Sequence, residues 1–187
     1  MRGVVPYNAR DIMKRLGLAL VFGLGALVVV NGQAGLDART QGQIKKLFPN
    51  ATNISPKVAE PPHFKVYAGD PKDPNALIGY AFWTTELTPL ERGYDGPIKV
   101  LVGMTPQARV TGIVVAEHKE PYGDFSIDTA RFQDQFKNKD IRDRFAVGTD
   151  IDRIATATIS ISTVARSVRN SGRRIARALL TPPGNTE

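Results

Sequence analysis

The strongest constraint on the fold is a series of four apolar segments separated by turn residues. They occupy residues 64–67, 77–84, 98–104 and 110–118. The gaps between them hold turn-forming residues such as proline, aspartate and asparagine. Consecutive strands that are joined by short turns pair in antiparallel fashion. The sequence therefore predicts an antiparallel meander.

Helical patterns flank these strands. A short helix is predicted over residues 36–47, and Pro49 prevents it from continuing. Residues 50–62 are rich in proline, asparagine and serine and are predicted to form a loop. Two further helices are predicted over residues 128–136 and 161–180. Because the strands precede the main helices, we predict an α+β fold in which helices pack on one antiparallel sheet.

The amino end carries a predicted membrane anchor. Residues 16–30 contain no polar side chain and follow a basic leader. This run is shorter than the roughly 20 residues of a spanning helix, but the neighbouring residues from 12 to 36 complete the length. A cleaved signal peptide is the alternative, and the long leader and the poor cleavage pattern at residues 31–34 favour a retained anchor. The positive-inside rule then predicts a single-pass protein of the bacterial inner membrane, with its carboxyl-terminal part in the periplasm.

These features predict three regions. Residues 1–35 form a cytoplasmic basic end and membrane anchor, residues 36–62 a linker helix and loop, and residues 63–187 the folded domain. The chain has no cysteine, which excludes disulfides, iron–sulfur clusters and thiolate zinc sites, so redox chemistry requires a borrowed cofactor. Its 25 Lys and Arg against 18 Asp and Glu fit nucleic acid, an anionic membrane or an acidic partner. The predicted topology argues against nucleic acid.

A cluster of hydroxyl side chains precedes the last predicted helix. Thr156, Thr158 and Ser160 lie within five residues of one another. The first turn of a helix has unpaired backbone N–H groups and the positive end of the helix dipole, which together favour a phosphate group. Helix capping by serine and threonine is the simpler alternative.

Three motifs, taken in order, resemble those of one protein family. Gly93-Tyr94-Asp95-Gly96-Pro97-Ile98 and the strand after it look like a GY-x-GPI-x-VLVG signature, and His118-Lys119-Glu120-Pro121 resembles an H-x-EP turn. The hydroxyl cluster follows in the same order. On these motifs residues 36–180 resemble the FMN-binding domain family. Its members include flavin subunits of the Rnf and sodium-pumping NADH:quinone oxidoreductase complexes and the periplasmic domain of NosR, which is the nearest in character.

The resemblance implies where flavin is attached. In this family FMN is linked through its phosphate to a threonine of an S-G-A-T-x-S/T segment, and a separate flavin transferase installs it from FAD. Thr158 matches the acceptor, and Ala157 and Ser160 also fit the segment. Ala155 and Thr156 stand where the family has serine and glycine, and a β-branched threonine lacks the conformational freedom of glycine. Non-covalent FMN and loss of the flavin are therefore the alternatives to covalent attachment.

The other motif residues are candidate flavin contacts. Tyr94 and Gly96 either edge the flavin or only form a turn. His118 and Glu120 either hydrogen-bond the isoalloxazine ring or form a surface pair. No spacing of metal ligands joins His118 to the other histidine, His63, so no metal site is predicted.

Aromatic and basic residues outside the motifs also have two interpretations each. Tyr122 and Phe125 either cover the flavin ring or pack in the core. Four arginines share one face of the last predicted helix at positions 166, 169, 173 and 177. They form either a solvated face or a docking surface for an acidic electron-transfer partner or for anionic lipid.

The sequence thus predicts a membrane-anchored periplasmic FMN-binding electron carrier. Its expected partners are a membrane redox complex or a periplasmic electron-transfer protein, and a flavin transferase for maturation. The flavin supplies the chemistry, so substrate turnover by the protein itself is not expected. The alternative is a structural or assembly subunit of a membrane redox complex that has the same fold without flavin.

Overall fold

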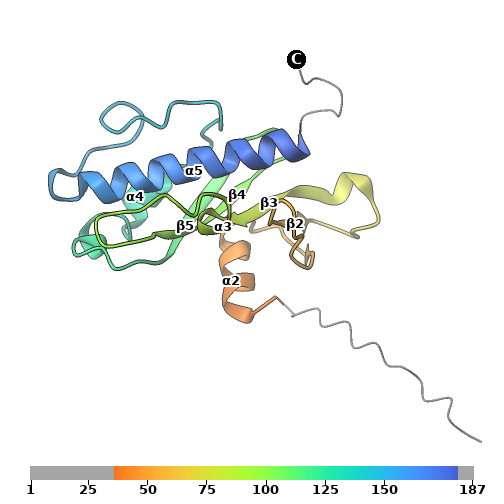
Figure 1. Cartoon of the computed structure of the whole chain (residues 1–187). Helices are drawn as coiled ribbons and strands as arrows, with labels where there is room; N and C mark the ends of the chain where they lie inside the picture. Colours follow the sequence, from red (N-terminus) through yellow and green to blue (C-terminus); the bar gives the residue numbers. More distant parts are fainter. Residues whose placement is uncertain (1–35, 181–187) are drawn as a thin grey trace, which may run out of the picture. The chain divides into compact units, whose positions relative to one another are not determined.

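The computed structural model describes residues 36–180, which form a five-stranded antiparallel sheet with helices (Figure 1). The strands follow the chain in spatial order β1-β2-β3-β4-β5. They are β1 (Asn53–Ile54), β2 (Phe64–Tyr67), β3 (Leu77–Trp83), β4 (Lys99–Met104) and β5 (Val110–Glu117). The predicted meander and the α+β class are confirmed. The two-residue β1 lies in a segment that we predicted as loop, where Asn53 pairs with Tyr67.

The helices are α2 (Ala38–Leu47), α3 (Thr84–Leu87), α4 (Ala130–Asp134) and α5 (Thr158–Leu179), with short 3₁₀ turns η1 (Pro74–Ala76), η2 (Gly123–Phe125) and η3 (Ala155–Ala157). Helix α4 is shorter than predicted because Thr129 caps it, its Oγ1 accepting the N–H of Phe132 at 3.3 Å. Helix α3 was not predicted. Helix α5 begins three residues before the predicted start, so Thr158 and Ser160 of the hydroxyl cluster lie in its first turn and Thr156 lies in η3.

Helix α5 lies along one face of the sheet and α2 lies on the other (Figure 1). Alternate side chains of each strand therefore enter two separate cores. Tyr80 and Phe82 of β3 pack beneath α5, whereas Ala81 and Trp83 of the same strand pack toward α2. Because the sheet is covered on both faces, its central strands are nearly continuous runs of buried residues.

The core on the α2 side has a floor of glycines. Cβ atoms added to Gly79 and Gly103 would lie 2.5 and 2.9 Å from the ring of Phe48, and one added to Gly112 would lie 3.2 Å from Leu47. These three glycines leave the space that the end of α2 occupies. Helix α2, predicted as part of a linker, is therefore packed on the sheet.

The predicted anchor over residues 1–35 lies outside the described residues. Within residues 36–180 there is no helix with the length and apolar character needed to span a bilayer.

Candidate functional site

A pocket of about 490 Å³ opens at the amino-terminal end of α5. Its wall combines the start of the helix with the loop after β5 and the loop after α3. The lining residues are Tyr94, Pro121, Tyr122, Ala155, Thr156, Ala157, Thr158, Ile159 and Ser160. Pockets of this size commonly hold small ligands.

The first turn of α5 presents its polar groups to this pocket. Ala157 occupies the N-cap position, and no side chain caps the helix there. Thr158 is exposed, and its hydroxyl has only long contacts of 3.4 Å with the carbonyls of Ile154 and Ala155. Helix α5 has 22 residues, so its dipole is fully developed at this end. A phosphate group at this point is favoured by both the backbone N–H groups and the dipole.

The turn that carries Tyr94 forms another part of the lining. The N–H of Gly93 donates to the carbonyl of Gly96 at 2.7 Å, which closes the turn. Gly96 has φ +121°, a conformation that favours glycine. The turn leaves the ring of Tyr94 71% exposed at the pocket rim. Tyr122 and Ile159 are also more than half exposed, so an apolar rim surrounds the hydroxyls.

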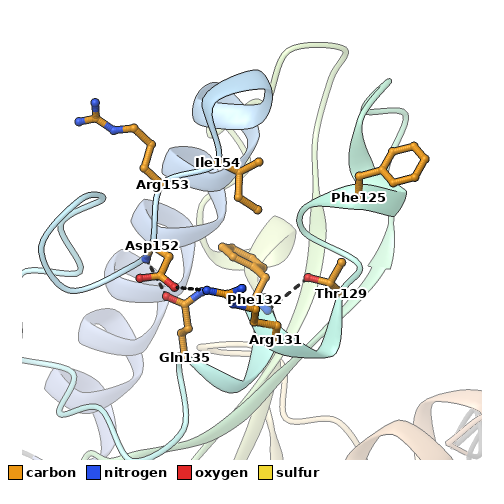
Figure 2. A pocket seen from close by; sticks show the side chains of 8 residues that line it. All are labelled: Phe125, Thr129, Arg131, Phe132, Gln135, Asp152, Arg153 and Ile154. Atoms are coloured by element: carbon orange, nitrogen blue, oxygen red, sulfur yellow. Dashed lines mark hydrogen bonds and ion pairs between the residues drawn. The ribbon is translucent and has the colours of Figure 1, made fainter.

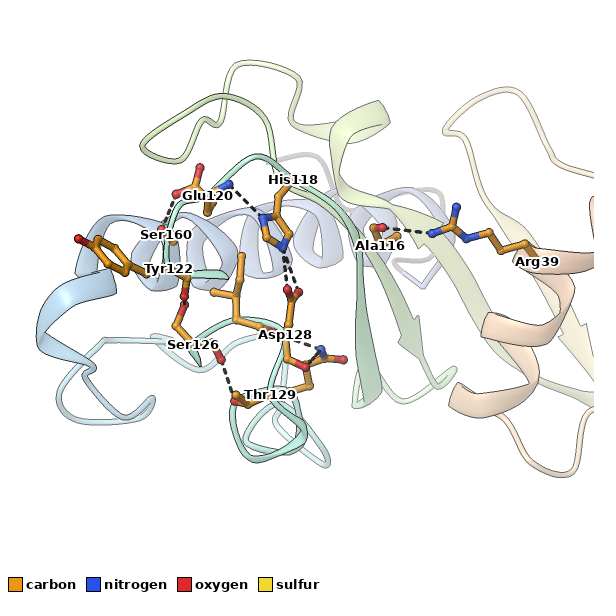
Figure 3. A network of polar contacts seen from close by, with 11 residues as sticks. Arg39, Ala116, His118, Glu120, Tyr122, Ser126, Asp128, Thr129 and Ser160 are labelled. Atoms are coloured by element: carbon orange, nitrogen blue, oxygen red, sulfur yellow. Dashed lines mark hydrogen bonds and ion pairs between the residues drawn. The ribbon is translucent and has the colours of Figure 1, made fainter. Parts of the chain in front are cut away.

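Glu120 joins the start of α5 to the turn that carries Tyr94, and Figure 3 shows its contacts with Ser160 and His118. The residue is only 6% exposed. Its Oε2 accepts the N–H of Tyr94 and its Oε1 that of Asp95, both at 3.0 Å, and Ser160 Oγ donates a short hydrogen bond to Oε2. Burial raises the pKa of this carboxyl, but the three hydrogen bonds and His118 outweigh burial and lower the pKa below its usual value.

His118 supports the segment that carries Glu120. Its Nδ1 accepts the N–H of Glu120 at 3.0 Å, so the ring proton is on Nε2, which donates to the carboxylate of Asp128 at 2.9 Å (Figure 3). A Cβ on Gly123 would lie 2.1 Å from the His118 ring. The ring is therefore fixed by two hydrogen bonds and by the absence of a side chain at residue 123.

The structure brings together five of the eight predicted site residues. Tyr94, Thr156, Ala157, Thr158 and Ser160 line the pocket. Glu120 is not among the lining residues and has both carboxylate oxygens bonded to protein groups. Gly96 and His118 line a neighbouring hollow instead.

Sequence reasoning did not identify the supporting residues. Gly93 leaves room for the carboxylate of Glu120, since a Cβ there would lie 2.4 Å from Oε1. Gly123 and Asp128 hold His118, as described above. The two glycines lie in or beside the motifs, which is a signal in the sequence, but their contacts are with residues distant along the chain.

Thr156 replaces the glycine of the family segment without visible strain. It lies in η3, and the described residues with positive φ do not include it. The backbone at this position therefore suits an ordinary L-residue.

A second pocket of about 470 Å³ adjoins the first along the chain (Figure 2). Phe125, Phe132 and Ile154 give it an apolar part, and Arg131 pairs with Asp152 at 3.5 Å across it. Phe125 is exposed rather than packed in the core. Ile154 ends this pocket and Ala155 begins the other, so one short segment contributes to both.

The arginine face of α5 is largely occupied by contacts within the domain. Arg166 pairs with Glu91 at 3.2 Å, and Arg169 donates to the carbonyl of Arg144 at 3.1 Å. Arg173 donates to three carbonyls of residues 141–143 at 3.0–3.1 Å. Arg169 and Arg173 hold the loop at residues 141–144, a role that neither of our two interpretations included.

Among residues 36–180, no cluster of three or more histidine and acidic side chains offers a place for a metal ion. The family model described as the FMN-binding domain matches residues 93–171. That range contains the turn at residues 93–96, the His118–Glu120 segment and the first turn of α5. No curated protein matches the chain.

Proposed function

Residues 93–171 belong to the FMN-binding domain family, and we propose that this chain is a membrane-anchored periplasmic electron carrier with FMN linked through its phosphate to Thr158. The observation that carries the proposal is the pocket at the start of α5. There an exposed threonine hydroxyl lies at an uncapped helix end inside the matched domain.

The residues present fit the phosphate end of FMN. Thr156 and Thr158 supply exposed hydroxyls, and the first turn of α5 supplies N–H groups and the positive end of its dipole. The apolar rim of Tyr94, Tyr122 and Ile159 suits the flat flavin ring. When bound, FMN supplies electron transfer, and the chain supplies position and surroundings.

The attachment is a balanced group transfer. The hydroxyl oxygen of Thr158 forms a bond to the phosphorus of the FMN half of FAD. The bond between the two phosphates of FAD breaks, and AMP leaves with the hydroxyl proton. No electron is gained or lost, and a flavin transferase catalyses the step. Because η3 accepts Thr156 without positive φ, the loss of the family glycine is compatible with this reaction.

The lining of the pocket supports a carrier rather than a turnover enzyme. Its nine residues include no aspartate, glutamate, histidine, lysine or arginine. Of the groups that serve in general acid–base catalysis, the lining holds only the phenols of Tyr94 and Tyr122, which are more than half exposed. The exposed rim instead leaves the flavin open to another redox protein. We infer that this partner is a membrane redox complex or a periplasmic electron-transfer protein.

Membrane attachment rests on the apolar run at residues 16–30, which follows a basic leader. Ala155 and Thr156, which depart from the family segment, favour one other candidate function. In that case the chain is a flavin-free structural or assembly subunit of a membrane redox complex.

Intact mass tests the proposal directly. The full chain is produced in cells with a flavin transferase, purified under denaturing conditions and compared with Thr158→Ala and Thr156→Ala. We expect an added FMN phosphodiester mass in the wild type and in Thr156→Ala, and no such mass in Thr158→Ala. An unmodified wild type whose native preparation also lacks flavin would favour the flavin-free subunit. Recovery of the wild type in the soluble fraction would contradict the anchor.

A further inference from the structure

We propose that Glu120 is the positioning residue of the flavin site: its carboxylate joins the turn at residues 93–96 to the first turn of α5 and so fixes the pocket onto which Thr158 opens. This inference rests on the proposed function for its meaning. It differs from our prediction that Glu120 contacts the flavin ring, because both oxygens are bonded within the protein.

The contacts of Glu120 connect parts of the chain that are far apart in sequence. Tyr94 and Asp95 lie 26 and 25 residues before it, and Ser160 lies 40 residues after it. Tyr94 and Ser160 both line the pocket and belong to two separate segments of the chain. The carboxylate therefore joins these two segments directly, beside the contact that Thr163 Oγ1 makes with the carbonyl of Arg92 at 2.8 Å.

The chemistry of the link requires a carboxylate. All three partners donate hydrogen bonds, two from backbone N–H groups and one from a hydroxyl. A glutamine of the same shape has one oxygen acceptor, and its amide nitrogen would face a donor. Hydrogen bonds to a charged acceptor are also stronger than those between neutral groups.

The residues around Glu120 leave room for its carboxylate and hold its backbone. Gly93 leaves space for its oxygens, and His118 accepts the N–H of Glu120 itself. His118 is in turn bonded to Asp128. The side chain and the backbone of Glu120 are thus both held, which is the arrangement expected of a residue that positions others.

The test uses the full chain and two readouts, one of them independent of flavin. The first is the initial rate of FMN attachment, followed by intact mass with purified flavin transferase and FAD. The second is amide hydrogen exchange over residues 90–97 and 155–162 before any flavin is added. We expect Glu120→Gln to slow attachment about tenfold or more and to speed exchange in both segments, because charged hydrogen bonds are lost.

Two control variants separate positioning from general stability. Ser167→Ala removes a buried hydroxyl that donates to Thr163 within α5, and Arg173→Met loosens the opposite end of the helix. We expect both to be modified at the wild-type rate. Should Glu120→Gln fail to fold, Ser160→Ala replaces it, because this variant removes one link and keeps the two N–H contacts. It is expected to slow attachment about threefold.

Unchanged attachment and exchange in Glu120→Gln would overturn the inference, as would equal slowing by Arg173→Met. If the wild type accepts no FMN, the proposed function fails, and the exchange experiment still decides whether Glu120 holds the two segments together. If exchange in Glu120→Gln rises only over residues 90–97, the link to α5 is refuted.

Discussion

The two ends of α5 use polar side chains in opposite ways. At the amino-terminal end, a buried carboxylate accepts hydrogen bonds from Ser160 and from the N–H groups of Tyr94 and Asp95. In the carboxyl-terminal half, Arg173 donates hydrogen bonds to loop carbonyls. About 33 Å of helix separates the two termini of α5. At the amino-terminal end the N–H groups of a turn donate to the carboxylate. In the carboxyl-terminal half the carbonyl groups of a loop accept from the arginine.

This difference supports our proposal that the amino-terminal end of α5 holds the flavin. The carboxylate of Glu120 does not itself line the pocket, so the exposed hydroxyls of the lining remain accessible. At the other end the guanidinium groups of Arg169 and Arg173 form hydrogen bonds with the carbonyl groups of the loop itself. A second hollow near Arg142, Arg173 and Leu180 exists at that end, but Arg142 is paired with Asp140 and Arg173 with backbone carbonyls.

The largest expected difference between the two ends comes from two glycines. In Gly123→Ala the new Cβ would lie 2.1 Å from the fixed ring of His118, and we expect a loss of about 3 kcal/mol in the free energy of unfolding. In Gly172→Ala the new Cβ would lie 2.2 Å from Cδ1 and 2.5 Å from Cγ1 of Ile141, whose aliphatic side chain can change rotamer where the hydrogen-bonded His118 ring cannot. Because alanine also favours helix by about 1 kcal/mol, the net loss should be about 1 kcal/mol or less.

Urea unfolding of both variants checks this order. Flavin attachment should fall in Gly123→Ala and stay unchanged in Gly172→Ala. Equal destabilisation of the two variants would show that His118 is not held as tightly as its contacts indicate.

Arg173→Met tests the carboxyl-terminal end alone. Methionine keeps the apolar stem but loses the hydrogen bonds to three carbonyls, so we expect a loss of about 1.5 kcal/mol. Arg177→Met, on the same exposed face, is the matched control and should change stability by less than about 0.5 kcal/mol. Thermal unfolding measures both, and a similar loss in the two variants would argue against a specific role for Arg173.

Acid titration compares one carboxylate from each end. Hydrogen bonds from Arg142 hold the pKa of Asp140 far below its usual value, and Glu120 is shifted in the same direction by its own donors. A carboxyl whose folded pKa is lowered stabilises the protein above its unfolded pKa, and this stability is lost as the pH falls through the folded pKa. Stability should therefore fall below about pH 4.5 in the wild type.

Asp140→Asn and Glu120→Gln should each lose less stability than the wild type between pH 7 and pH 3, as followed by urea unfolding at each pH. A steeper loss in either variant would contradict the direction of that shift. In the wild type, amide hydrogen exchange at pH 4 should also show a larger loss of protection in the segments that Glu120 joins than in the rest of the domain, because protonation of this carboxylate weakens its hydrogen bonds.

The smallest expected effect is that of Thr156→Gly, which restores the family residue. Since Thr156 does not have positive φ, glycine relieves no strain there. It increases the conformational entropy of the unfolded chain. We expect a loss of about 0.5–1 kcal/mol in stability and an unchanged mass of attached flavin. A marked rise in attachment would show that the transferase itself reads the glycine.

The sequence predicted the strands well because their signal is local. Alternation and turn residues placed β2, β3, β4 and β5 within one residue of their bounds. The start of α5 was missed by three residues, since the threonines and serine there favour caps and turns as much as helix. Strand β1 and helix α3 are too short to produce a periodic pattern.

The site could be predicted only in part, because its chemistry is local and its support is not. The hydroxyls of Thr156, Thr158 and Ser160 are close together in sequence, so the sequence could predict that they lie at one site. The role of Glu120 depends on partners 25 to 40 residues away. The use of Arg173 likewise depends on a loop some 30 residues earlier. Such contacts form only when the chain folds, and no regular spacing of residues in the sequence indicates them.

The glycine floor beneath Leu47 and Phe48 has a mechanical consequence. Any pull on the chain ahead of α2 enters the domain where this helix packs, on Gly79, Gly103 and Gly112 in the adjacent strands β3, β4 and β5. Helix α2 lies on the face of the sheet opposite α5 (Figure 1). In our proposal the anchor precedes α2, so its pull would reach the domain on the face opposite the helix that lines the pocket.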